Sequence, residues 1–199
     1  MNPISPDVAK KFCELCNWAY ECWVTHKRLF DENTRTETTI ARAQYFTARL
    51  SVITQEYSLL QICKLHDPAV QKGAVNITID YIVRFGDWGR DADRINGYVQ
   101  HLTSLFEKLK SARNKVLAHN DLEAIMESTA LGEFPEGLDD KYFSVLQELV
   151  NAVHEKWLDG LYPFNDLAGA DVGEFLHVLE KAEQIVPGVS EKAALFLRP

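Results

Sequence analysis

Apolar residues recur at intervals of three and four along most of the 199-residue chain, which is the period of an amphipathic helix. The longest such row follows Asp91 and predicts the seam of a bundle helix: Ile95, Tyr98, Leu102, Leu105, Leu109, Ala112 and Val116. Another row predicts a helix over Leu138–Leu158: Phe143, Leu146, Leu149, Val150, Val153 and Trp157. The pattern therefore favours packed helices over alternating strands.

Two further helices are expected nearer the N-terminus. Ser5, Pro6 and Asp7 combine a capping hydroxyl, a proline at the first helical position and an acid in the first turn, which predicts a helix from there to about Phe30. A longer helix is predicted over residues 34–66, and Pro68 prevents it from continuing. Its apolar residues share one face: Phe46, Leu50, Ile53, Tyr57 and Leu60.

The remaining segments are shorter. Asn76 is typical of a helix cap and predicts a helix over Ile77–Phe85, although the β-branched run VNITIDYIV is also compatible with a strand. Residues 120–137 hold two glycines and a proline and predict a loop, and a last helix is expected over Val172–Ile185. The predicted fold is all-α: an antiparallel up-and-down helical bundle of about five to six helices.

No repeat or linker divides the sequence, so we expect residues 1–199 to form a single domain, with residues 161–199 as an acidic helical extension. No apolar run approaches the roughly 18 residues that a membrane span needs, so no membrane association is expected. The N-terminus lacks a basic region followed by an apolar core, and a cytoplasmic location is therefore expected.

The net charge of −8 is unevenly distributed. Residues 1–120 hold 16 basic and 13 acidic side chains, whereas residues 121–199 hold 5 and 16. An acidic solvated surface that aids solubility explains this difference. The alternative is that an anion site lies in the first 120 residues, with the acidic tail shielding it or meeting a basic partner.

Four cysteines raise the question of a metal site. Cys13 and Cys16 have CxxC spacing, but on a helix they share one face, while Cys22 and His26 lie on roughly the opposite one. A second CxxC pair, as in a zinc ribbon, is absent from the sequence. We therefore expect Cys13, Cys16, Cys22 and Cys63 to be buried, reduced, structural thiols, and we expect no metal or other cofactor.

The segment SARNKVLAHND, residues 111–121, extends the helix that follows Asp91 and carries unusual polar residues. His119 continues the apolar seam, where a core histidine with hydrogen-bonded ring nitrogens is the simplest explanation. Arg113 and Asn114 lie beside the seam, where side chains are normally solvated. Neither explanation accounts for all three residues together.

This combination resembles the arginine–histidine signature of the HEPN superfamily (higher eukaryotes and prokaryotes nucleotide-binding domain), in which four to six residues separate the two. RNKVLAHND is similar to the branch associated with phage abortive infection, the AbiU-like proteins. The stretch Ser58–Asp67, SLLQICKLHD, also resembles the second-helix segment of that branch. The resemblance covers about residues 10–160.

The resemblance implies a metal-independent endoribonuclease of the toxin or phage-defence kind, in which the RNA 2′-hydroxyl attacks its own phosphate. An imidazole can move the proton near neutral pH, and a guanidinium fits the phosphate oxygens. His119 would then be the acid/base and Arg113 the phosphate clamp. Asn114 would orient the histidine or the phosphate, and Asp121 would fix the imidazole tautomer.

A second pair, Arg94 and His101, also fits the bare signature. Its context differs, because Arg94 lies in the first turns of its helix and precedes a seam residue, so we prefer Arg113. Three lysines add positive charge near Arg113, opposed by Glu107, and are candidate RNA contacts: Lys108, Lys110 and Lys115. Lysines near a helix end also complement the helix dipole, which is an equally good explanation.

Residues 113 and 119 would point about 120° apart on a straight helix. Either the helix bends near Ala118, or the site is shared across a two-fold interface. The resemblance implies the second, a homodimer whose two motifs meet in one cleft. The expected partners are a restricted RNA, a second copy of the chain, and an antitoxin or regulatory protein. The alternative function is a non-catalytic helical module that binds nucleotide, RNA or a protein.

Overall fold

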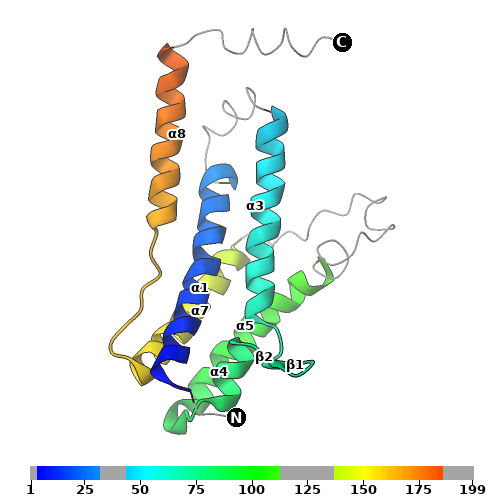
Figure 1. Ribbon diagram of the computed structural model, residues 1–199, viewed down its shortest axis with the longest axis vertical. Helices are drawn as coiled ribbons and strands as arrows, with labels where there is room; N and C mark the ends of the chain where they lie inside the picture. The colour runs from blue at the N-terminus through cyan, green and yellow to red at the C-terminus, as the bar shows by residue number, and fades with distance from the viewer. Residues whose placement is uncertain (1–3, 32–43, 113–136, 186–199) are drawn as a thin grey trace. The chain divides into compact units, whose positions relative to one another are not determined.

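The computed structural model describes residues 4–31, 44–112 and 137–185, and almost all of them are helical (Figure 1). Six α-helices lie within these residues: α1 (Pro6–His26), α3 (Gln44–Leu65), α4 (Ile79–Phe85), α5 (Ala92–Ala112), α7 (Leu138–Trp157) and α8 (Leu167–Ile185). A π-helical turn, η1 (Lys27–Asp31), extends α1, and a 3-10 turn, η2 (Gly89–Asp91), leads into α5. A two-stranded hairpin joins α3 to α4: β1 (Val70–Gln71) and β2 (Ala74–Val75). The predicted all-α helical bundle is confirmed.

The described residues gather into two compact units. One contains α1 up to Tyr20, α3 from Glu56, and everything described from there to Asn165. The other contains the end of α1, η1, the first part of α3, and α8. Each unit has its own packing.

The core of the first unit is built around α5 and α7, which pack against each other. The predicted seams account for most of it, since eight of their members are buried and Tyr98 and Trp157 are half-buried. The buried members are Ile95, Leu102, Leu105, Phe143, Leu146, Leu149, Val150 and Val153. Phe12, Cys13 and Cys16 add the buried face of α1. The 3-4 spacing predicted which side of α5 and of α7 faces the core.

The start of α4 differs from the prediction. Thr78, not Asn76, caps this helix, because its Oγ1 atom accepts a hydrogen bond of 3.3 Å from the Tyr81 amide. Asn76 instead donates from Nδ2 to the Pro68 carbonyl across the base of the hairpin. The hairpin turns at Lys72 and Gly73, both with positive φ (50° and 85°), and Gly73 adopts this conformation without steric cost. The run VNITIDYIV is thus divided between β2 and α4.

An irregular segment after α7 is held by side-chain amides. Gln147 donates from Nε2 to the Tyr162 carbonyl (2.7 Å) and accepts at Oε1 from the Phe164 amide (2.6 Å). Asn151 accepts from the Tyr162 amide, and the Phe164 ring stacks on Tyr20 at 5.0 Å. These contacts satisfy backbone groups that no helix or sheet would satisfy.

In the second unit, η1 packs against α8. Arg28 pairs with Asp166 at 3.1 Å, just before α8 begins. The helix starts at Leu167, five residues before the predicted Val172, and the Ala170 amide bonds to the Asp166 carbonyl. The prediction was wrong about this end because the apolar row becomes regular only from Val172 onward.

The predicted apolar row of α3 lies on the outside of the helix. Phe46, Ile53, Tyr57 and Leu60 are all exposed, and Leu50 is half-buried. The side of α3 that packs inward carries a different set: Thr47, Ser58, Leu59, Gln61, Ile62, Cys63 and Leu65. Because both faces of α3 carry apolar residues, the row predicted from periodicity does not identify the face that packs inward.

Among the residues that the structure describes, no helix is both long and apolar enough to cross a membrane.

Candidate functional site

Helix α5 leads directly to the predicted RNA-cleaving segment. The described part of α5 runs to Ala112, next to Arg113 in the sequence. Five of the predicted site residues lie outside the described residues: Arg113, Asn114, Lys115, His119 and Asp121. Lys108 and Lys110 belong to the last two turns of α5. The arrangement of these site residues therefore stays a prediction, whereas the packing of the helix that precedes them is described below.

The C-terminal half of α5 is anchored by its contact with His66. Leu102, Leu105 and Phe106 are buried, and the Phe106 ring stacks in parallel on the His66 imidazole, with centroids 4.1 Å apart. Phe106 lies seven residues before Arg113, which is two helical turns. Packing at this point thus fixes the direction in which α5 approaches the predicted site.

His66 belongs to the SLLQICKLHD segment, and its surroundings disfavour the protonated form of its imidazole. Its Nε2 atom lies 2.9 Å from the Tyr142 hydroxyl. Burial lowers the pKa of His66 from 6.5 to about 4, so the ring is neutral at pH 7. Tyr142 is fully buried, and burial raises the pKa of its hydroxyl, which keeps its proton and can donate it to Nε2. His66 therefore acts as a packed core residue and not as a proton-transfer group near neutral pH.

The rival pair, Arg94 and His101, does not form a site. Both residues lie on the exposed surface of α5. The Arg94 guanidinium reaches back to Asp91 at 3.1 Å, whereas His101 lies seven residues in the other direction, about 10 Å along the helix axis. The two side chains are not brought together around one phosphate.

Three of the four cysteines are buried in the core. Cys13, Cys16 and Cys63 are buried thiols outside any disulfide, as predicted, but the same prediction was wrong for Cys22, which is partly exposed. Burial raises the pKa of Cys13 to about 12 and that of Cys16 well above its ordinary value, so both are protonated thiols at neutral pH. The Cys13 thiol donates to the Val150 carbonyl at 3.9 Å. No group of three or more metal-binding side chains converges within the part of the chain that the structure describes.

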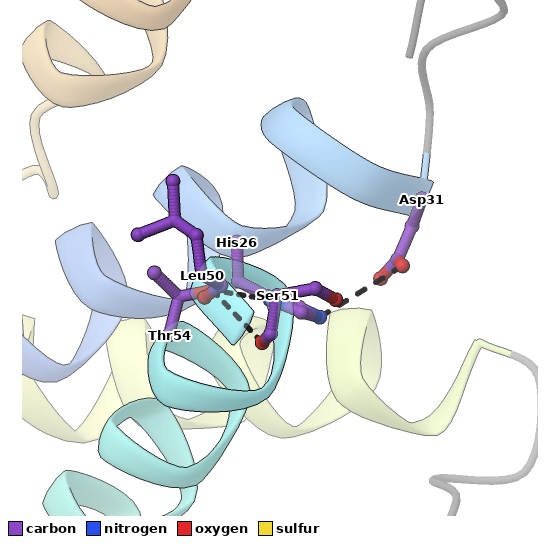
Figure 2. A network of polar contacts seen from close by, with 5 residues as sticks. All are labelled: His26, Asp31, Leu50, Ser51 and Thr54. Atoms are coloured by element: carbon purple, nitrogen blue, oxygen red, sulfur yellow. Dashed lines mark hydrogen bonds and ion pairs between the residues drawn. The ribbon is translucent and has the colours of Figure 1, made fainter. Parts of the chain in front are cut away.

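A hydroxyl–histidine–carboxylate group that the sequence did not reveal occurs at the end of α1 (Figure 2). The Nδ1 atom of His26 lies 2.9 Å from Thr54 Oγ1, and its Nε2 atom lies 3.9 Å from Asp31 Oδ1. His26 and Asp31 are close in the sequence, but Thr54 lies 28 positions after His26, and the three residues form no motif. Only the fold brings α1, η1 and α3 together here.

The contacts of Thr54 favour a structural role over a catalytic triad. The Thr54 hydroxyl has two acceptors within its own helix, the Leu50 carbonyl at 2.9 Å and the Ser51 carbonyl at 3.1 Å, and when it donates to either of them its oxygen can accept from His26 Nδ1–H. Burial lowers the pKa of His26, with the nearby Asp31 carboxylate acting against this shift. We interpret the group as a structural link between α1 and α3.

The comparisons with known proteins point to one family. Residues 7–178 match the model of the HEPN family AbiU2. The matched range includes α1 to α7 and the whole of the 111–121 segment. Neither the curated proteins nor the solved structures contain a match to this chain.

Proposed function

Because the chain belongs to the AbiU2 family of HEPN-type abortive-infection proteins, we propose that it is a metal-independent endoribonuclease. The observation that carries the proposal is the position of the Arg113–His119 segment. It follows α5 directly, and it lies inside the range that matches the family. The described histidines for which a pKa shift is resolved, His26 and His66, both have it lowered by burial, which makes them poor candidates for the same role.

The proposed reaction is an internal phosphoryl transfer. His119 removes the proton from the RNA 2′-hydroxyl, whose oxygen then forms a bond to the adjacent phosphorus. The bond from phosphorus to the 5′-oxygen breaks, and this leaving oxygen takes up a proton, so that the products carry a 2′,3′-cyclic phosphate and a 5′-hydroxyl. Arg113 binds the phosphate oxygens as their negative charge increases, and Asn114 orients the ring or the phosphate. Asp121 supports the tautomer of His119.

The site is proposed to form in a homodimer that binds a restricted RNA. Two copies would each bring an Arg113 and a His119 to a shared cleft, which overcomes the 120° separation on one helix. Lys108, Lys110 and Lys115 would contact neighbouring phosphates. A chain with a net charge of −8 attracts RNA weakly overall, so a local basic surface and an antitoxin or regulatory protein would determine when it acts.

Cleavage of a mixed RNA pool tests the proposal. The purified chain, with chelator present, should produce 2′,3′-cyclic ends, and His119→Ala should reduce the rate by at least about a hundredfold, the usual contribution of a general acid–base group. Arg113→Ala should reduce it to a similar extent.

His101→Ala is the matched control, because this histidine is exposed on α5 and belongs to the rival pair. It should cleave like the unaltered chain. Equal cleavage by the unaltered chain and by His119→Ala would contradict the assignment. If neither cleaves, including after addition of proteins encoded beside it, the non-catalytic binding module is the correct description.

A further inference from the structure

Helix α8 carries apolar side chains on two faces. Val172 and Leu176 are buried, on the face that packs within its own unit. Three other apolar side chains are exposed: Leu167 (69%), Phe175 (51%) and Val178 (63%). At 100° per residue, Val178 points about 140° away from the middle of the buried pair, and Phe175 points about 80° away from it. The exposed residues therefore form a second apolar row, which we call the outer face of α8.

Two carboxylates lie along the outer face. At 100° per residue, Asp171 falls between Phe175 and Val178 around the helix, and Glu174 lies at the edge of the same row. Both residues are exposed, and within the described residues neither carboxylate has an ion-pair or hydrogen-bond partner. Glu180 differs, because it lies 3.8 Å from His177 of the same helix. The outer face thus combines apolar surface with negative charge that the described residues do not neutralise.

The charge of α8 restricts what can cover this face. Between Leu167 and Ile185 the sequence has four acidic residues and one basic residue, a net charge of −3. RNA and anionic lipid surfaces carry charge of the same sign and would be repelled. A second copy of α8 would bring the same negative charge, which disfavours self-pairing. A basic protein segment, in contrast, would gain both apolar burial and charge pairing.

We propose that the outer face of α8 binds a basic amphipathic helix of a partner protein. Apolar side chains of that helix pack on Phe175 and Val178, and Lys or Arg side chains beside them pair with Asp171 and Glu174. An extended peptide would not follow the row, because its side chains alternate at every second residue. The proposal extends the proposed function, since it assigns a surface and a chemistry to the regulatory protein. Binding at α8 is measured without RNA, so failure of either proposal is seen separately.

Fluorescence titration with two labelled peptides, each as long as α8 (19 residues), is the first test. One peptide has a row of leucines flanked by Lys and Arg, and the other has Glu in place of every Lys and Arg. The full chain should bind the basic peptide and not the acidic one. Asp171→Lys combined with Glu174→Lys should weaken binding of the basic peptide at least about tenfold and should allow the acidic peptide to bind.

Matched control variants separate this face from the charge of the whole chain. Glu155→Lys combined with Asp159→Lys changes the net charge equally at exposed positions outside α8, and it should leave both titrations nearly unchanged. Val178→Ser removes apolar surface from the outer face and should weaken binding of the basic peptide roughly tenfold. Leu161→Ser removes a side chain that is equally exposed (62%) but lies outside α8, and it should have little effect.

Failure of the basic peptide to bind would overturn the proposal. Equal weakening by the charge control would also overturn it, because it would indicate attraction to the chain as a whole. Light scattering and circular dichroism melting of Val178→Ser identify other occupants. A change in mass would mean that a second copy covers this face, and a lower melting temperature would mean that another part of the same chain does. Either result contradicts a partner helix, whereas weaker peptide binding with unchanged mass and melting supports it.

Discussion

His66 lies at the end of α3, between Phe106 of α5 and Tyr142 of α7, and its burial has a measurable consequence for stability. The folded chain holds this imidazole neutral, with its pKa lowered from 6.5 to about 4. Between about pH 4 and pH 6.5, the unfolded chain therefore binds a proton at His66 more readily than the folded chain does. The contribution of neutral His66 to the free energy of unfolding is therefore fully present above about pH 6.5, and it is lost as the pH falls towards 4.

We expect His66→Gln to flatten this dependence. The unaltered chain should lose up to about 1.4 kcal/mol of unfolding free energy per pH unit through this residue, or roughly 3 kcal/mol in total. The glutamine variant should be less stable at pH 7, because it loses the stacking on Phe106, but it should lose less on acidification. Urea unfolding at several pH values between 4.5 and 7 measures both slopes, and identical slopes would contradict the assignment.

At the residue scale, the sequence predicted burial better than it predicted polar contacts. Four thiols were expected to be buried. Cys13, Cys16 and Cys63 are buried, because a short apolar side chain on an inward helix face packs into the core, whereas Cys22 is partly exposed. The pairs His66–Tyr142 and His26–Thr54 were not predicted. They join residues 76 and 28 positions apart, and no local pattern records such a contact.

At the scale of elements, periodicity predicted the existence of the helices and most of their ends. It placed α7 within one residue of its observed end, since the apolar row and the helix coincide there. It did not indicate which of the two apolar faces of α3 packs inward, and it placed the cap of α4 at the wrong residue. The sequence predicted Asn76 as the cap, but its side chain bonds to the Pro68 carbonyl at the hairpin, and Thr78 caps the helix instead.

Substitution of Thr78 tests this cap. Thr78→Val keeps the shape of the buried side chain but removes the hydroxyl that accepts from the Tyr81 amide, and it should reduce the unfolding free energy by about 1–2 kcal/mol. Thr78→Ser keeps the hydroxyl and should cost less. Asn76→Ala should cost about 0.5 kcal/mol, because its hydrogen bond is exposed. Urea unfolding ranks the three variants, and a larger effect of Asn76→Ala would support the cap originally predicted from the sequence.

At the scale of the whole molecule, family and fold were predictable from the sequence, whereas the RNA-cleaving site stays a prediction. The all-α bundle follows from periodicity, and the HEPN relationship follows from residues 111–121 together with the SLLQICKLHD segment. In the proposed site, the convergence of Arg113 with His119 requires geometry beyond Ala112 and a second copy of the chain. Neither requirement can be tested from the spacing of residues along one chain.

The distribution of thiols provides a measure of how the folded chain opens. Three cysteines belong to the buried core of the unit that contains α5 and α7, namely Cys13, Cys16 and Cys63, whereas Cys22 is partly exposed. The raised pKa of Cys13, about 12, means that a thiolate does not form there in the folded state even in mildly alkaline buffer. Reaction of the buried thiols with a reagent therefore requires opening of the core.

We expect a colorimetric thiol reagent to react with one cysteine quickly and with three slowly. Cys22→Ser should abolish the fast phase and leave the slow phase unchanged, because Cys22 lies outside the buried core. Urea below the unfolding midpoint should accelerate the slow phase, since it increases the population of open molecules. Fast reaction of two or more thiols, or a slow phase that urea does not change, would show that this core is accessible without opening.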